Sequence, residues 1–101
     1  MQFDHVSVGK KANIYYDGKC ISHTVTMPDG LRKSVGVILP STLHFDLTTK
    51  EVREVVDGCA VVSIDGAPEQ AFAAGDRWTV EAGSYFVIRT TAPMHYVCHF
   101  G

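Results

Sequence analysis

Acidic, basic and imidazole side chains are concentrated between residues 44 and 58, in the segment HFDLTTKEVREVVDG. His44 and Asp46 are two residues apart, so on a β-strand their side chains point to the same face. Glu51 begins the next β-prone run, after a turn that contains two threonines, and Arg53 follows it by two residues on the same face. The spacing predicts that two strands present these side chains to each other.

These residue types suit chemistry on a small polar or anionic molecule. A carboxylate inside a β-barrel is costly unless it is paired or used, which makes Glu51 and Asp46 candidate catalytic groups. His44 can hold an anion or deliver a proton because histidine titrates close to neutral pH. Arg53 can bind a phosphate through two N–H groups. Each also has an ordinary alternative: Arg53 can neutralise Glu51 or Glu54 at the surface, and His44 can be a surface residue.

Turn signals divide the chain into short β-prone runs. The expected strands span residues 12–16, 19–26, 31–39, 43–47, 51–56, 59–64, 70–73, 77–80, 85–91 and 94–100. Gly- and Pro-containing turns with no long helical period predict an all-β barrel or sandwich. We expect residues 1–101 to form a single domain, with residues 1–11 as an N-terminal arm.

Composition and charge restrict the class of partner. The formal net charge is −2 at pH 7, whereas a nucleic-acid-binding domain usually carries a basic face. No apolar run approaches the roughly 18 residues of a membrane span, and the N-terminus lacks the apolar segment of a signal peptide. Cys20, Cys59 and Cys98 are scattered without C-x-x-C spacing, which predicts reduced, mostly buried thiols. We expect a cytoplasmic protein that binds neither nucleic acid nor membranes.

The segment His44–Gly58 resembles the first motif of the cupins. In that motif two histidines one residue apart are followed by a glutamate and, six residues later, by a glycine. Asp46 stands where the second metal-binding histidine would be. Residues 75–90 resemble the second cupin motif, with Phe86 in place of its histidine. The resemblance implies a single-domain, cupin-like β-barrel or jelly roll that has lost its metal ligands.

A closer resemblance extends over nearly the whole chain, from about Val8 to Gly101. It rests on KSVGV at residues 33–37, Glu51 followed by Val55-Val56-x-Gly58, Ala74-Gly75, and Tyr96-Val97-Cys98. In order and spacing these motifs are similar to those of the small cupin-type pyrimidine/purine nucleoside phosphorylases. The resemblance implies metal-independent, broad-specificity phosphorolysis of nucleosides to a free base and a pentose 1-phosphate. Inorganic phosphate is then the co-substrate, and no cofactor is implied.

Phosphorolysis of a nucleoside makes three demands on a site. It needs a cradle for the phosphate, stabilisation of positive charge on the ribose, and a proton or hydrogen bond for the leaving base. We expect the catalytic residues to be Glu51, His44 and Asp46. We expect the substrate-binding residues to be Arg53, Ser84, Phe86, Trp78 and Tyr96. The aromatic side chains among them offer flat surfaces for a base, although such residues also fill cores. The role of Arg53 is inferred from its spacing and not from the resemblance.

Two other functions fit parts of the sequence. A cupin of this kind can bind a small molecule without catalysis. It can also be a metal-dependent enzyme that uses His44, Asp46, Glu51 and a C-terminal histidine. An open barrel also leaves exposed edge strands, which such proteins commonly cover by pairing with a second copy. We therefore expect a homodimer in which the N-terminal strands are paired or swapped.

Overall fold

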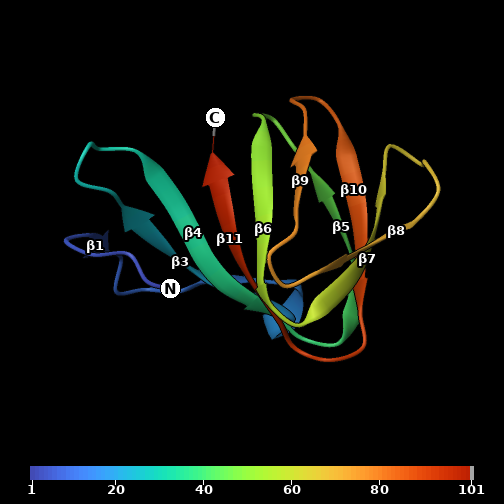
Figure 1. Cartoon of the computed structure of the whole chain (residues 1–101), viewed down its shortest axis with the longest axis horizontal. Coiled ribbons are helices and arrows are strands. Elements are labelled where there is room, and N and C mark those ends of the chain that lie inside the picture. The colour runs from blue at the N-terminus through green and yellow to red at the C-terminus, as the bar shows by residue number, and fades with distance from the viewer. Residues whose placement is uncertain (101) are drawn as a thin grey trace.

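The computed structural model describes residues 1–100 and contains two antiparallel sheets (Figure 1). The seven-stranded sheet, called the large sheet below, contains β1 (Ser7–Val8), β2 (Asn13–Tyr15), β3 (Cys20–Thr26), β4 (Arg32–Ile38), β6 (Glu51–Asp57), β9 (Arg77–Val80) and β11 (Met94–Phe100). The four-stranded sheet, called the small sheet, contains β5 (Ser41–Asp46), β7 (Cys59–Ile64), β8 (Gln70–Ala73) and β10 (Tyr85–Thr90).

The order of strands places β11 in the interior of the large sheet, between β4 and β6. That sheet runs β1-β3-β4-β11-β6-β9, with β2 also paired to β3, and the small sheet runs β5-β10-β7-β8. The chain moves back and forth between the sheets, so strands that are neighbours in sequence often face each other across the interior. Within the described range, no helix has the length and apolar character needed to cross a membrane.

The all-β class predicted from the turn signals is confirmed, and the bounds of β7, β8, β9 and β11 agree with the predicted ranges. The N-terminal region differs in two details. The arm expected at residues 1–11 includes β1, which pairs with β3. The turn between the strands expected at residues 12–16 and 19–26 is a short 3-10 segment, η1 (Tyr16–Gly18), in which Tyr16 and Asp17 both have a φ of 53°. Aspartate and glycine tolerate such left-handed backbone better than other residues, which explains the turn signal at this point.

The core lies between the two sheets and is built from alternate residues of their strands. In β10, Phe86 and Ile88 are buried, whereas Arg89 is exposed. Ile38 and Val55 of the large sheet belong to the same cluster. Burying a side chain of this size contributes about 1.5–3 kcal/mol. Apolar packing therefore holds the inner faces of the two sheets together.

The segment of residues 44–58 crosses from one sheet to the other. Its first part ends β5 in the small sheet and its second part forms β6 in the large sheet, so the two strands do not pair. Gly58 then redirects the chain into β7 with a φ of 87°. A Cβ at Gly58 would lie 2.8 Å from the carbonyl oxygen of Pro93. Both backbone conformation and space therefore favour glycine at this corner.

Candidate functional site

A pocket of about 610 Å³ lies against the inner face of the large sheet. Its polar lining includes Ser22, Ser34, Glu51, Arg53 and Cys98, all from strands of that sheet. Its apolar lining includes Phe45 of the small sheet together with Ile14, Tyr15, Tyr16 and Phe100. The pocket thus combines hydrogen-bonding groups with aromatic side chains, an arrangement typical of small-molecule sites.

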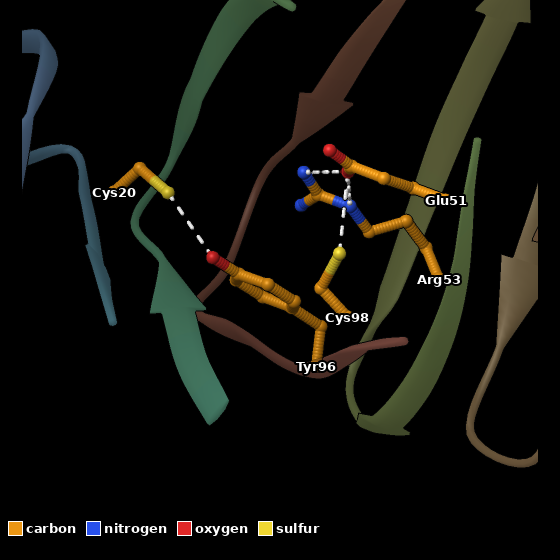
Figure 2. A network of polar contacts seen from close by, with 5 residues as sticks. All are labelled: Cys20, Glu51, Arg53, Tyr96 and Cys98. Carbon is orange, nitrogen blue, oxygen red and sulfur yellow. Dashed lines mark hydrogen bonds and ion pairs between the residues drawn. The ribbon is translucent and has the colours of Figure 1, made fainter. Parts of the chain in front are cut away.

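Glu51 is the centre of a hydrogen-bond network in this pocket (Figure 2). Arg53 donates from Nε and Nη2 to Glu51 Oε1, at 3.1 and 2.9 Å. The Cys98 thiol donates to the same oxygen, with Sγ at 3.2 Å. The register of β6 and β11 places Cys98 directly across from Arg53, and Glu51 shares the face of Arg53. All three donors use Oε1, so Oε2 has no hydrogen-bond donor within residues 1–100.

The guanidinium of Arg53 is enclosed by aromatic rings. Its Cζ lies 5.3 Å from the ring centroids of Phe45 and Phe86 and 5.1 Å from that of Tyr96. Burial by itself lowers the pKa of Arg53, but its acidic neighbours, with Cys98 first among them, outweigh burial and raise the pKa above its ordinary value. Arg53 therefore carries a fixed positive charge that cation–π contacts help to hold.

The thiol of Cys98 serves as a hydrogen-bond donor in this network. Burial raises its pKa to about 12, although the charge of Arg53 acts in the opposite direction. A thiol in this state is protonated at neutral pH and is a poor nucleophile, because the thiolate is the reactive form. Its proton instead helps to orient the carboxylate of Glu51.

The side chain of Tyr96 passes over Gly36 and brings its hydroxyl close to Cys20. Its hydroxyl is 3.4 Å from Cys20 Sγ (Figure 2), and Gly36 is its cross-strand neighbour on β4. A Cβ at Gly36 would lie 3.0 Å from the Tyr96 hydroxyl and 2.5 Å from the carbonyl oxygen of Ile21. Glycine at this position therefore leaves the room that the tyrosine ring occupies. Burial raises the pKa of Tyr96, so its hydroxyl keeps its proton.

His44 and Asp46 share one face of β5, as their spacing predicts, and His44 Nε2 lies 2.9 Å from Asp46 Oδ1. Their expected position inside the barrel is wrong. Phe45, the residue between them, packs against the core, so strand alternation turns its neighbours outward. The side chains of His44 and Asp46 are 51% and 84% exposed, and the His44 ring stacks on Tyr85. Both stand at the rim of the pocket, where Tyr16 donates a hydrogen bond to the backbone carbonyl of His44.

The remaining predicted residues lie below or beside the pocket. Phe86 is fully buried beneath Arg53 and stacks with Phe45. Trp78 is 5% exposed, packs against Phe72 and Phe86, and does not line the pocket. Ser84 precedes β10, where its carbonyl oxygen accepts a hydrogen bond from the backbone of Leu47, and it too lies outside the lining. The structure thus brings Glu51, Arg53 and Tyr96 together at the pocket, with Phe86 as their support.

Sequence reasoning missed several residues of the pocket. Cys98 was expected to be a buried structural thiol, and its part in the network follows only from its register with Arg53. Phe45 was overlooked between the more reactive His44 and Asp46. The apolar alternation of Leu43, Phe45 and the following leucine in the sequence is the signal that indicates its inward orientation.

The histidines at the C-terminus belong to the opposite face of the large sheet. His99 lies 2.9 Å from Glu54 Oε1 and 2.6 Å from Lys33 Nζ, and His95 is exposed. In the part of the chain that the structure describes, no three His, Cys, Asp or Glu side chains are grouped so as to hold a metal ion. Cys20 and Cys98 are buried as expected, whereas Cys59 is exposed.

Comparison with solved structures defines the class of protein first. The structure superposes with a TM-score of 0.64 on the EutQ protein of Clostridium difficile, over 80% of this chain and 68% of that chain at 19% identity. This likeness, with the two facing antiparallel sheets, shows that the chain has an all-β, cupin-like fold. A protein of unknown function from Acinetobacter sp. ADP1 is similar over 99% of this chain and 98% of its own, with a TM-score of 0.96 and 43% identity.

Comparison with known sequences then gives the family. Residues 10–100 match the family model described as pyrimidine/purine nucleoside phosphorylase. A protein of that name from Methylococcus capsulatus is 54% identical over 101 residues, covering 99% of this chain and 98% of the relative. Another of that name from Laribacter hongkongensis is 51% identical over 100 residues, covering 98% and 97%. The chain belongs to the pyrimidine/purine nucleoside phosphorylase family, as the resemblance implied.

Proposed function

We propose that this protein catalyses the phosphorolysis of purine and pyrimidine nucleosides, with inorganic phosphate as co-substrate and without a metal ion. The names of its relatives support the activity. The ion pair of the half-buried Glu51 and the buried Arg53 is the observation that carries the proposal at this pocket. It offers one oriented carboxylate and one oriented guanidinium beside an aromatic wall, which suits a substrate made of sugar, anion and base.

Glu51 acts on the ribose in this proposal. Its Oε1 accepts the three bonds described above, so the second oxygen is available for ribose hydroxyls. The same carboxylate stabilises the positive charge that develops on the ribose as the glycosidic bond breaks. Because its donors hold it in place, it needs little reorganisation in the transition state.

Arg53 binds phosphate. Its Nε and Nη2 donate hydrogen bonds to Glu51, whereas Nη1 has no hydrogen bond to residues 1–100. Arg53 also borders the pocket, and a guanidinium N–H is a strong donor to a phosphate oxygen. The two roles place anion and sugar next to each other, which is the geometry that the reaction requires.

The reaction balances without a further co-reactant. An oxygen of hydrogen phosphate forms a bond to the anomeric carbon C1′ while the bond from C1′ to the base nitrogen breaks. The electron pair leaves with the base, and the proton given up by hydrogen phosphate neutralises the released base. Burial raises the pKa of both Cys98 and Tyr96, so neither side chain serves as a general base at neutral pH.

A direct assay tests the activity. Protein treated with EDTA is incubated with phosphate and with uridine or adenosine, and the free base and pentose 1-phosphate are measured by chromatography. We expect both products, in equal amounts, from both nucleosides. If no common nucleoside releases base above background, the catalytic function is wrong and a non-catalytic binding cupin is the better description. Activity that EDTA abolishes and a divalent metal restores would instead support a metal-dependent enzyme.

We also propose that the protein is a homodimer made from single-domain protomers. A groove of about 790 Å³ lies on the outer face of the large sheet, where Ile21, Val35 and Val37 give it an apolar character. An apolar groove on the outer face of a sheet favours a second copy as its cover. Sedimentation should give a species of twice the 11.0 kDa chain mass at micromolar concentration. A monomer at that concentration would contradict this assignment.

The cytoplasmic location predicted from the unpaired cysteines stays a prediction, which cell fractionation checks.

A further inference from the structure

The part of the pocket farthest from Glu51 along the sheet is polar but uncharged. Ser22 on β3 and Ser34 on β4 line it, and they are 4% and 8% exposed. Ser34 is the cross-strand neighbour of Cys98, whose other neighbour is Arg53 on β6. The inner face therefore presents a serine, a thiol and a guanidinium in one row across β4, β11 and β6.

The hydrogen bonding of the Ser34 hydroxyl is unusual for a side chain that is so deeply buried. Ser22 Oγ accepts a hydrogen bond from Asn13 Nδ2 at 3.5 Å, whereas Ser34 Oγ takes part in no hydrogen bond within residues 1–100. Within residues 1–100, the one side-chain nitrogen or oxygen that is both completely buried and without a partner is Trp78 Nε1. Because Ser34 Oγ lacks a partner but is not in this class, it is not completely buried. A buried hydroxyl without a protein partner normally finds one in the adjoining space. For Ser34 that space is the pocket.

The spacing of the row suits a nucleoside. Strands β4 and β6 are separated by β11, so the backbones that carry Ser34 and Arg53 lie about 10 Å apart at the usual interstrand distance. That distance leaves room for a ribose between a group bound near Arg53 and a group bound near Ser34. Phe45 of the small sheet lines the same pocket as Ser34, and its ring centroid is 5.3 Å from Cζ of Arg53 at the other end of the row. Phe86 and Tyr16 hold the Phe45 ring in place, at centroid distances of 5.2 and 5.5 Å. A flat, neutral group can therefore meet a hydroxyl at its edge and a ring at its face.

We propose that Ser34 is the base-contacting residue of a nucleobase subsite, in which its hydroxyl contacts the edge of the base and Phe45 contacts its face. This inference rests on the proposed function and extends it by dividing the pocket into a charged part and a base-binding part. A serine hydroxyl rotates, donates one hydrogen bond and accepts others. It can donate to a base carbonyl or ring nitrogen and accept from an amino or imino group. One side chain thus accommodates both purines and pyrimidines, at the cost of discriminating weakly between them.

The experiment compares Ser34→Ala with Ser34→Thr, which keeps the hydroxyl, and with Ser7→Ala, which removes a hydroxyl from the exposed strand β1. A lost neutral hydrogen bond predicts a kcat/KM for uridine and adenosine that is about three- to tenfold lower in Ser34→Ala. The KM for phosphate should stay within about twofold, because the phosphate site does not include this hydroxyl. Ser34→Thr should retain more of the activity than Ser34→Ala, and Ser7→Ala should match the wild type. Melting temperatures identify any variant that has not folded.

Two kinetic results would overturn the inference. Unchanged nucleoside kinetics in Ser34→Ala would show that the hydroxyl does not touch the base. A raised KM for phosphate with unchanged nucleoside kinetics would place Ser34 at the anion. Calorimetric titration with uracil and adenine tests the subsite separately from catalysis. Weaker binding of both bases by Ser34→Ala than by the wild type supports the subsite even if no nucleoside is cleaved. Equal binding, or binding of neither base to the wild type, contradicts it.

Discussion

Two ionic clusters occupy opposite faces of the same strands of the large sheet, and their surroundings differ. On the inner face, Glu51 and Arg53 form an ion pair with side chains that are 15% and 9% exposed. On the outer face, Glu54 pairs with Arg77, and these side chains are 30% and 58% exposed. Both pairs join a glutamate of β6 to an arginine, from β6 itself on the inner face and from β9 on the outer face. Of the two, the inner pair lies against the pocket and beneath aromatic rings.

Burial, and not the presence of charged residues, separates a candidate site from an ordinary surface. Water screens the outer pair, and exposed ion pairs typically contribute less than about 1 kcal/mol. Ions taken out of water pay a large desolvation cost, which good geometry and additional hydrogen bonds must offset. Cys98 supplies such a bond on the inner face. A charged pair kept under these conditions is a strong candidate for a role in function.

The largest expected difference concerns activity. Glu51→Gln should lower kcat/KM for uridine by about 100- to 1,000-fold, because it removes the charge that stabilises the ribose in the transition state. Glu54→Gln, the same change on the outer face, should stay within about twofold of the wild type. Steady-state kinetics with saturating phosphate measure both. Equal losses in the two variants would show that the inner position has no special role.

The next difference concerns stability. Arg53→Ala leaves the carboxylate of Glu51 buried without its partner, and such a loss costs about 3–5 kcal/mol. Arg77→Ala removes the partner of Glu54 in a solvent-exposed setting and should cost less than about 1 kcal/mol. Urea unfolding of the two variants gives the free energies. Similar costs for both would mean that the inner pair is as well hydrated as the outer one.

A smaller effect is expected at the thiol that orients the carboxylate. Cys98→Ala removes the donor to Glu51 Oε1 and should lower kcat for uridine by about three- to tenfold, less than a typical hydrogen bond to a charged group because a thiol is a weak donor. Cys98→Ser keeps a donor of similar size and should recover part of that loss. If alanine and serine behave alike, the thiol acts by packing and not by its hydrogen bond.

The smallest effect is a dependence of stability on alkaline pH. The pKa of Cys98 is raised from 9.0 to about 12 in the folded protein. An unfolded chain loses the thiol proton first, so the contribution of Cys98 to stability is complete below about pH 9 and is lost as pH rises toward 12. The Cys98→Ser variant has no group at this position that titrates in this range. Its free energy of unfolding, measured in urea, should therefore fall less between pH 8 and 10 than that of the wild type. Parallel curves for the two proteins would contradict the raised pKa.

The sequence predicts most of the fold because its turns are chemically explicit. Aspartate–glycine and proline-containing turns separate runs of β-branched and aromatic residues, and the strand bounds follow from them. The short strand β1 was missed because Ser7 and Val8 carry no such signal. Its pairing with β3 is a long-range contact that local propensity does not encode.

The candidate site was only partly predictable. The spacing of Glu51 and Arg53 correctly placed them on one face, since strand alternation is a local rule. The same rule put His44 and Asp46 on one face but does not say which face is inward. Burial of Phe45 decided that question, and apolar burial outweighs the placement of two polar groups. The enclosure of Arg53 and the bond from Cys98 depend on strands far apart in sequence, so they required the structure.

A crystal structure of the protein with inorganic phosphate bound is the most direct test of the claim that the pocket on the inner face is the active site. We predict a phosphate in the pocket on the inner face of the large sheet, within hydrogen-bond distance of Arg53 and next to Glu51. A phosphate bound at Arg77 or Lys33 on the outer face, with the inner pocket empty at saturating phosphate, would contradict the claim.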